Sequence, residues 1–121
     1  MEKKKTLVIG ASANPNRYSY LAINKLVQYG HPVVAIGNRK ATIAGVDVDT
    51  EKIAYKNIDT VTLYINPGRQ QEYYNYILSL HPKRIIFNPG TENDELEKLA
   101  LKNNIIAQQA CTLVLLGTNQ F

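Results

Sequence analysis

Five short, mostly apolar runs recur along this chain, and they limit the folds it can adopt. Continuous runs of β-branched and aliphatic residues at this length are typical of parallel strands that are covered on both faces. The predicted strands are Thr6–Ile9, Val33–Ile36, Val61–Ile65, Arg84–Phe87 and Ile105–Ala107.

Helical patterns separate most of these strands. The first helix is predicted over Leu21–Tyr29, with Ser19 as its N-cap and Gly30 just beyond its C-terminus. Apolar residues at helical spacing predict two more helices, over Gln70–Leu80 and Glu92–Asn103. Strands and helices therefore alternate over most of the chain.

Residues 41–58 break this alternation. Gly45 separates Thr42 and Ile43 from an alternating pair, Val46 and Val48. The segment fits either a small hairpin or an irregular excursion, in the place where a standard crossover would supply a helix.

The alternation predicts an α/β fold, a doubly wound parallel sheet whose five main strands run in the order 3-2-1-4-5. A length of 121 residues suits a single domain over residues 1–121. In such a sheet, ligands bind at the carboxyl ends of the strands, near the point where the strand order reverses. The loops that follow the strands are therefore the candidates for function.

The composition limits the cellular compartment and the binding partners that we expect for this chain. The net charge is +4, but the basic residues are not clustered and no nucleic-acid motif is present, so we expect no nucleic-acid partner. No apolar run approaches the length of a membrane span, and Leu7–Ile9 is too short for the core of a signal peptide. The single cysteine, Cys111, fits a reducing compartment. We therefore expect a soluble, cytoplasmic protein with no membrane partner.

The loop after the first strand reads G-A-S-A-N-P-N-R-Y-S, from Gly10 to Ser19. It starts like a dinucleotide-binding fingerprint, but Ser12 and Pro15 stand where G-x-G-x-x-G needs its later glycines. The Ser12 hydroxyl, the start of the next helix and the Arg17 guanidinium nevertheless suit a phosphate. The alternative is an ordinary strand-to-helix turn in which Gly10 serves backbone geometry and Arg17 is solvated.

The loop after the second strand carries positive charge. An NAD-binding unit needs an acidic residue here to hold the ribose hydroxyls, whereas this chain has Asn38, Arg39 and Lys40. Two cations favour a phosphorylated ribose, as in NADP or a 3′-phosphorylated adenosine. The alternative is a solvated basic turn.

Two N-P-G strings follow the third and fourth strands, at Asn66–Gly68 and Asn88–Gly90. Each is typical of a turn at the entry to a helix. The functional interpretation is that the Asn66 and Asn88 side chains point into a ligand crevice.

The remaining reactive side chains form no catalytic set. Cys111 follows the fifth strand, where its thiol either touches a bound thioester or pantetheine or packs as a small buried residue. His31 and His81 each precede a proline, in turns that are predicted at the opposite end of the sheet. No residues have metal-ligand spacing, and no Ser–His–Asp or paired-carboxylate arrangement is present, so we expect no enzymatic activity.

Taken together, these loops resemble a known family. The chain is similar to the small stand-alone CoA-binding proteins, which are themselves similar to the N-terminal CoA-binding domain of succinyl-CoA synthetase α subunits. Gly10–Ser19 looks like the family loop G-x-S-x-x-P-x-R-x-S, and Asn38–Lys40 stands where the family tends to show N-P-K. Phe87–Gly90 stands at W-x-Q-x-G, Asn93–Glu95 at N-x-E, and Cys111 where the family often keeps a cysteine.

The resemblance implies a Rossmann-like fold that binds CoA or an acyl-CoA. It also implies no ligase activity, since the phosphohistidine of the synthetase belongs to a separate domain. The resemblance also implies which residues would bind each part of the ligand. The pyrophosphate would lie on Gly10, Ala11, Ser12, Arg17 and Ser19. The adenosine 3′-phosphate would lie near Asn38, Arg39 and Lys40, and the pantetheine along Asn66, Pro67, Asn88 and Gly90.

The expected function is therefore non-catalytic binding of CoA or an acyl-CoA, a small nucleotide ligand, at the carboxyl ends of the strands. One alternative is an NADP-type nucleotide-binding protein or small reductase. Another is a regulatory subunit with an empty crevice and a homodimer or protein partner, to which Tyr74, off the apolar face of its predicted helix, would contribute.

Overall fold

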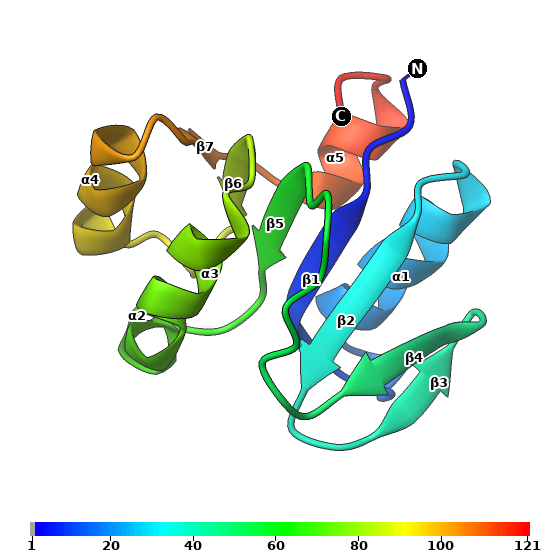
Figure 1. Cartoon of the computed structure of the whole chain (residues 1–121). Coiled ribbons are helices and arrows are strands. Elements are labelled where there is room, and N and C mark those ends of the chain that lie inside the picture. Colours follow the sequence, from blue (N-terminus) through cyan, green and yellow to red (C-terminus); the bar gives the residue numbers. More distant parts are fainter. Residues whose placement is uncertain (1) are drawn as a thin grey trace.

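Seven strands form one twisted sheet in the computed structural model, which describes residues 2–121 (Figure 1). The elements in chain order are β1 (Thr6–Ala11), α1 (Tyr18–Gln28), β2 (Val33–Gly37), β3 (Ala41–Ile43), β4 (Val46–Asp49), β5 (Thr60–Leu63), α2 (Pro67–Gln70), the 3₁₀ turn η1 (Gln71–Tyr73), α3 (Tyr74–Leu80), β6 (Arg84–Phe87), α4 (Asp94–Lys102), β7 (Ile106–Gln109) and α5 (Thr112–Gly117). The α/β doubly wound fold predicted from the alternating pattern is confirmed.

The order of the strands is β3-β4-β2-β1-β5-β6-β7, and every neighbouring pair is parallel except β3 with β4. The predicted order, which placed Val61–Ile65 beyond the second strand, is wrong, because β5 pairs with β1. Strand β4 of the hairpin takes the place beside β2, with Val48 opposite Ala35. The hairpin therefore fills the third-strand position without a helix, and the strand order reverses between β1 and β5.

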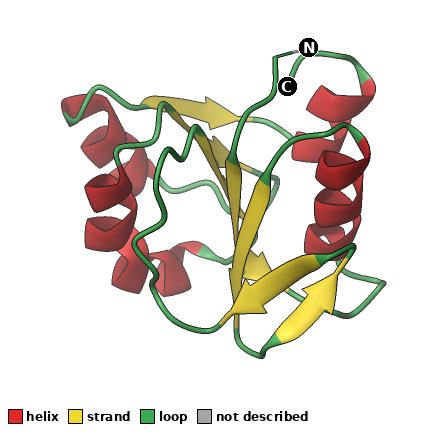
Figure 2. Cartoon of the chain, turned by 45° about the vertical axis from the view of Figure 1, so that its right-hand side comes forward, coloured by secondary structure: helices red, strands yellow, loops and turns green. Residues whose placement is uncertain are grey.

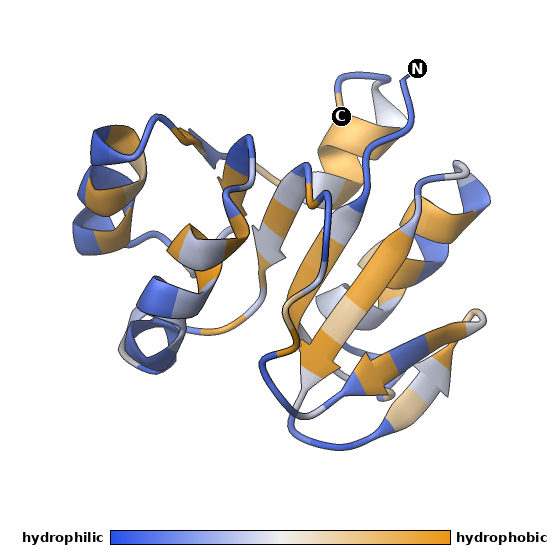
Figure 3. Cartoon of the chain, viewed as in Figure 1, coloured by the Kyte–Doolittle hydropathy of each residue, from blue (hydrophilic) through white to orange (hydrophobic). Residues whose placement is uncertain are grey.

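Helices cover both faces of the sheet. Figure 2 shows α1 and α5 on one side and α2, α3 and α4 on the other. Alternate residues of β1 point into the two cores: Leu7 and Ile9 pack with Ile77 of α3, and Val8 packs with Leu26 of α1. The strands carry most of the hydrophobic colour in Figure 3, whereas the outer surface of α4 is hydrophilic. Burial on both faces explains why these strands are continuous apolar runs.

Helix α1 begins earlier than predicted. Its N-cap is Arg17, so the prediction of Ser19 as the cap is wrong; Ser19 lies buried inside the first turn. The carbonyl of Arg17 accepts from the N–H groups of Tyr20 and Leu21, which closes that turn. The C-terminal prediction is confirmed, because Gly30 follows the C-cap with a φ of 83°.

The helix predicted over Gln70–Leu80 is three shorter pieces that start at Pro67. Asn66 caps α2, with its side chain accepting from the Arg69 N–H at 2.9 Å. The turn η1 then changes the helical phase. Tyr74, which was predicted to lie off the apolar face, is partly buried: it packs against the core, and its hydroxyl accepts from Asn93 at 2.8 Å.

The last two elements also depart from the pattern. Strand β7 forms the edge of the sheet, where Ile106 is 62% exposed, so it is not covered on both faces as predicted. Helix α5 was not predicted, because six residues are too few to show a helical period. It places Leu115 and Leu116 in the core beside α1. Within residues 2–121, no helix has the length and apolar character needed to cross a bilayer.

Candidate functional site

A cleft of about 400 Å³ opens at the carboxyl ends of β1, β5 and β6. It lies where the strand order reverses, as expected for this class of sheet. The sequence-predicted residues that line it are Gly10, Ala11, Ser12, Arg17, Ser19, Asn38, Asn66 and Gly90; its other lining residues are Tyr18, Tyr64, Ile65, Arg69, Pro89 and Thr91. The structure therefore brings most of the predicted site into one place.

Glycines allow the strand ends to meet tightly beneath this cleft. Gly10 has a φ of 95°, and a Cβ there would lie 2.8 Å from the Tyr64 carbonyl group and the Ile65 side chain. A Cβ on Gly37 would overlap the carbonyl oxygen of Ala11. Both positions therefore need glycine for main-chain packing. The backbone interpretation of Gly10 and its place in the site are compatible, because the tight turn forms the edge of the cleft.

The loop between β1 and α1 is held by its own side chains. The Ser12 hydroxyl accepts from the Asn14 N–H at 3.1 Å, and the Asn14 side chain accepts from the Asn16 N–H at 3.0 Å. Within residues 2–121, the N–H groups of Tyr18 and Ser19 have no acceptor. The first turn of α1 therefore presents free donors and the positive end of its dipole to the cleft.

Both charged side chains that line the cleft are cations, Arg17 and Arg69, and no carboxylate of the described chain lines it. The Glu92 carboxylate accepts from the N–H of the lining residue Gly90 at 2.8 Å. The Arg69 guanidinium donates to the Asn38 side chain at 2.8 Å, which links α2 to the loop after β2. Sequence reasoning missed Arg69, although the string N-P-G-R places it in the first turn of a helix after a strand. The arrangement suits a ligand with more than one negative charge.

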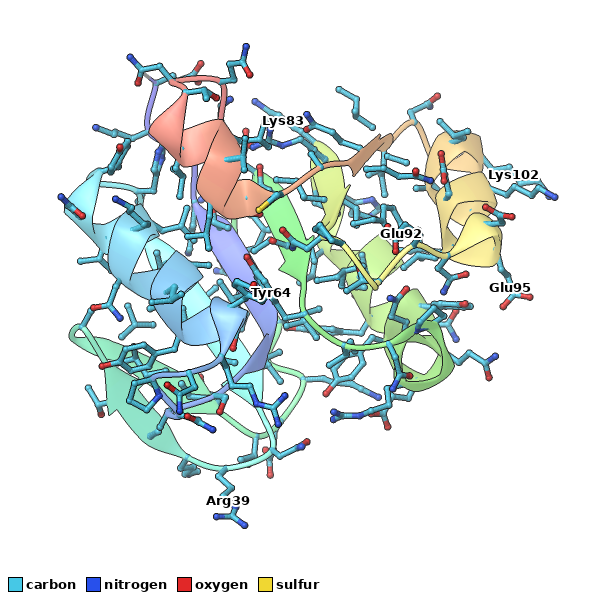
Figure 4. All side chains as sticks on the ribbon, turned by 180° about the vertical axis from the view of Figure 1, so that it is seen from behind. Arg39, Tyr64, Lys83, Glu92, Glu95 and Lys102 are labelled. Atoms are coloured by element: carbon cyan, nitrogen blue, oxygen red, sulfur yellow. The ribbon has the colours of Figure 1, made fainter. Side chains whose placement is uncertain are left out.

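Four predicted residues do not line this cleft. Arg39 and Lys40 are exposed, and Figure 4 shows Arg39 extending away from the body of the molecule. Pro67 is the first residue of α2 and shapes the entry to that helix. Asn38 also lines a second hollow, whose charged lining residues are Glu51, Lys52 and Glu72.

Asn88 is the fourth. Its side chain is 2% exposed and all its polar atoms are used inside the fold. The amide donates to the Thr62 hydroxyl at 2.7 Å and the Leu63 carbonyl at 2.9 Å. Its oxygen accepts from the Thr112 N–H at 2.8 Å. Asn88 therefore ties β5, β6 and α5 together beside the cleft.

A smaller cavity of about 220 Å³ adjoins the cleft, and Tyr18, Tyr64 and Pro89 line both. Asn88, Cys111 and Leu113 complete the lining. Tyr64 lies near the middle of the molecule (Figure 4). Burial raises the pKa of Tyr64 to about 12, so its hydroxyl stays protonated at neutral pH. Cys111 is a free cysteine, partly exposed, just before the start of α5.

The histidines lie away from this site, as predicted. His31 is buried at the opposite end of the sheet, where its Nδ1 accepts from the Lys4 N–H at 3.0 Å and its ring lies 4.9 Å from the Phe121 ring. His81 ends α3 in a left-handed conformation. Within residues 2–121, no cluster of three His, Cys, Asp or Glu side chains could hold a metal ion.

Comparison with known proteins agrees with this architecture. The family model of the CoA binding domain matches residues 4–117. A crystal structure of an uncharacterized protein is 48% identical, with full coverage of both chains and a TM-score of 0.97. A hypothetical protein from Pyrococcus horikoshii is 24% identical over 93% of this chain and 81% of its own, with a TM-score of 0.83.

A larger enzyme contains the same fold. The dinucleotide-forming acetyl-coenzyme A synthetase 1 of Ca. Korarchaeum cryptofilum is 16% identical over 88% of this chain, with a TM-score of 0.71. The match covers 25% of the synthetase chain. No curated protein matches the sequence.

Proposed function

This chain belongs to the CoA binding domain family, and from that premise we propose that it binds CoA or an acyl-CoA without catalysing a reaction. The observation that carries the proposal is the cleft at the strand ends. There the first turn of α1, with free N–H groups, lies in the same lining as Arg17 and Arg69, and no carboxylate of the described chain belongs to that lining. This combination suits a pyrophosphate.

The position of the basic loop favours one direction for the ligand. Asn38–Lys40 follow β2, so the adenosine and the 3′-phosphate would extend out of the cleft on that side, where the lining of the neighbouring hollow includes Glu51 and Glu72 as well as Lys52. Tyr64, Pro89 and Gly90 lie on the β5 and β6 side, which suits the less polar pantetheine. Because Arg39 and Lys40 are exposed, they would reach the 3′-phosphate only at the rim.

The test is calorimetric titration with CoA, dephospho-CoA, NADP and NAD. We expect CoA to bind and Arg17→Ala to weaken it by about 1.5–3 kcal/mol, the usual value of a hydrogen bond to a charged group. Lys102→Ala is the matched control, because Lys102 is an exposed cation at the end of α4 (Figure 4). Unchanged CoA affinity in the Arg17 variant would refute its role at the pyrophosphate.

The same titration separates the alternatives. Dephospho-CoA should bind more weakly than CoA if the basic loop holds the 3′-phosphate. Tighter binding of NADP than of CoA would favour the nucleotide-binding or reductase alternative, which the cations after β2 permit. Absence of any binding would favour the regulatory alternative, a subunit that acts through a homodimer or another protein partner. That partner and the cytoplasmic location both stay predictions.

A further inference from the structure

The smaller cavity adjoins the proposed CoA site. Tyr18, Tyr64 and Pro89 line both spaces, so the two spaces meet at these residues. The junction lies on the β5 and β6 side of the cleft, away from Arg69 and Asn38. A CoA oriented as proposed above would therefore point its thiol end toward the smaller cavity.

The lining of this cavity is mainly apolar, and no charged side chain belongs to it. Its most polar member, Asn88, has every side-chain hydrogen-bonding group occupied by Thr62, Leu63 and Thr112. An entering group therefore finds tyrosine rings, a proline and Leu113 rather than free amide groups. Burial without a partner is costly for a carboxylate and favourable for a hydrocarbon chain.

Tyr64 lines the junction with its ring rather than with its hydroxyl. The hydroxyl is buried and makes no well-formed hydrogen bond within residues 2–121, but it lies beside the hydroxyls of Thr62 and Thr112. Those two hydroxyls are hydrogen-bonded to each other at 2.8 Å. An entering thioester therefore meets the Tyr64 ring first, and the ring must move before the hydroxyl can donate to the thioester carbonyl.

We infer that the cavity lined by Tyr64, Cys111 and Leu113 receives the acyl chain of an apolar acyl-CoA, with the thioester carbonyl near Tyr64. The inference rests on the proposed function and names the class of thioester that the site selects. A cavity of about 150 Å³ suffices for the six carbons of benzene. The 220 Å³ available here therefore suits a chain of roughly six to nine carbons.

The test is calorimetric titration in reducing buffer with CoA and a series of thioesters: acetyl, butyryl, hexanoyl, decanoyl and succinyl. A buried methylene contributes about 0.8 kcal/mol, or about fourfold in affinity. We expect affinity to rise from acetyl-CoA to hexanoyl-CoA, by about tenfold or more over CoA, and to level off at decanoyl-CoA. Succinyl-CoA should bind no more tightly than CoA, because its carboxylate would be desolvated.

Leu113→Trp fills the cavity and leaves the lining of the larger cleft unchanged. We expect this variant to bind CoA like the wild type and to lose the advantage of hexanoyl-CoA. Leu101→Trp is the matched control, because Leu101 is 61% exposed on α4 and lines neither space. It should keep the full chain-length dependence.

The outcomes separate the two proposals. Binding of CoA with equal affinity for every thioester would overturn the acyl-chain inference and leave the proposed function standing. A preference for succinyl-CoA over hexanoyl-CoA would also overturn it. Failure of CoA and all thioesters to bind would refute the proposed function itself. The thioester series with the wild-type protein decides the question by itself, so the inference stays testable even if the Leu113 variant misfolds.

Discussion

Asn88 joins three elements beside the cleft, and its replacement by alanine should destabilise the whole domain. The substitution removes three hydrogen bonds of 2.7–2.9 Å from a side chain that is 2% exposed. At about 1 kcal/mol for each bond, the loss is about 3 kcal/mol. The Leu63 carbonyl and the Thr112 N–H would also lose a partner in the interior, so this figure is a lower bound.

Urea unfolding followed by circular dichroism measures this loss. For a domain of this size, about 3 kcal/mol corresponds to a fall in melting temperature of about 12 °C. Asn103→Ala is the control: it also removes an amide that donates to a carbonyl, that of Leu99 at 2.8 Å, but at an exposed position. We expect it to cost under about 1 kcal/mol. A loss below about 1 kcal/mol for Asn88→Ala would refute the reasoning. CoA titration of the folded variant then tests whether Asn88 also touches the ligand, as the resemblance implies.

Three further predictions concern the backbone, pH and the ligand. Gly37→Ala should cost about 1–3 kcal/mol in urea unfolding, because its Cβ would overlap the carbonyl of Ala11; a neutral result would show that the strands can separate there. Burial and the neighbouring lysines and arginine lower the pKa of His31 below 6.5, so the unfolded chain takes up the proton first. The free energy of unfolding should therefore be highest above about pH 6.5 and fall below it, and His31→Gln should remove that part of the slope. Tyr64→Phe should leave CoA affinity within about threefold and weaken hexanoyl-CoA, if its hydroxyl meets the thioester; an equal effect on both ligands would contradict that role.

The strands and loops could be predicted from the sequence because their signals are local. A run such as Arg84–Phe87 shows its burial in its own composition. The strand order could not be predicted in the same way, because pairing depends on distant segments. The alternating Val46 and Val48 indicate a strand, but nothing in them says that β4 would occupy the place beside β2 and leave β5 to pair with β1.

The same distinction between local signals and distant contacts applies to the residues of the candidate site. Gly10–Ser12 and Gly90 could be located because parallel strands bring their carboxyl ends to one edge. Arg69 and Tyr64 were missed, because one belongs to a helical turn and the other to the end of an apolar strand run. The internal role of Asn88 depends on Thr62 and Thr112, which only the folded chain brings near it.

The two glycines below the cleft have an evolutionary consequence. The loop between β1 and α1 lacks the later glycines of the dinucleotide-binding fingerprint. A close main-chain approach still occurs between Ala11 of β1 and Gly37 of the neighbouring strand β2. The requirement for glycine is thus shared between two segments that are distant in sequence. A relative that exchanges one of these glycines for a larger residue should carry a compensating change at the end of the other strand. The side chains around the rim are free of that constraint, so ligand preference can diverge while the floor of the cleft stays the same.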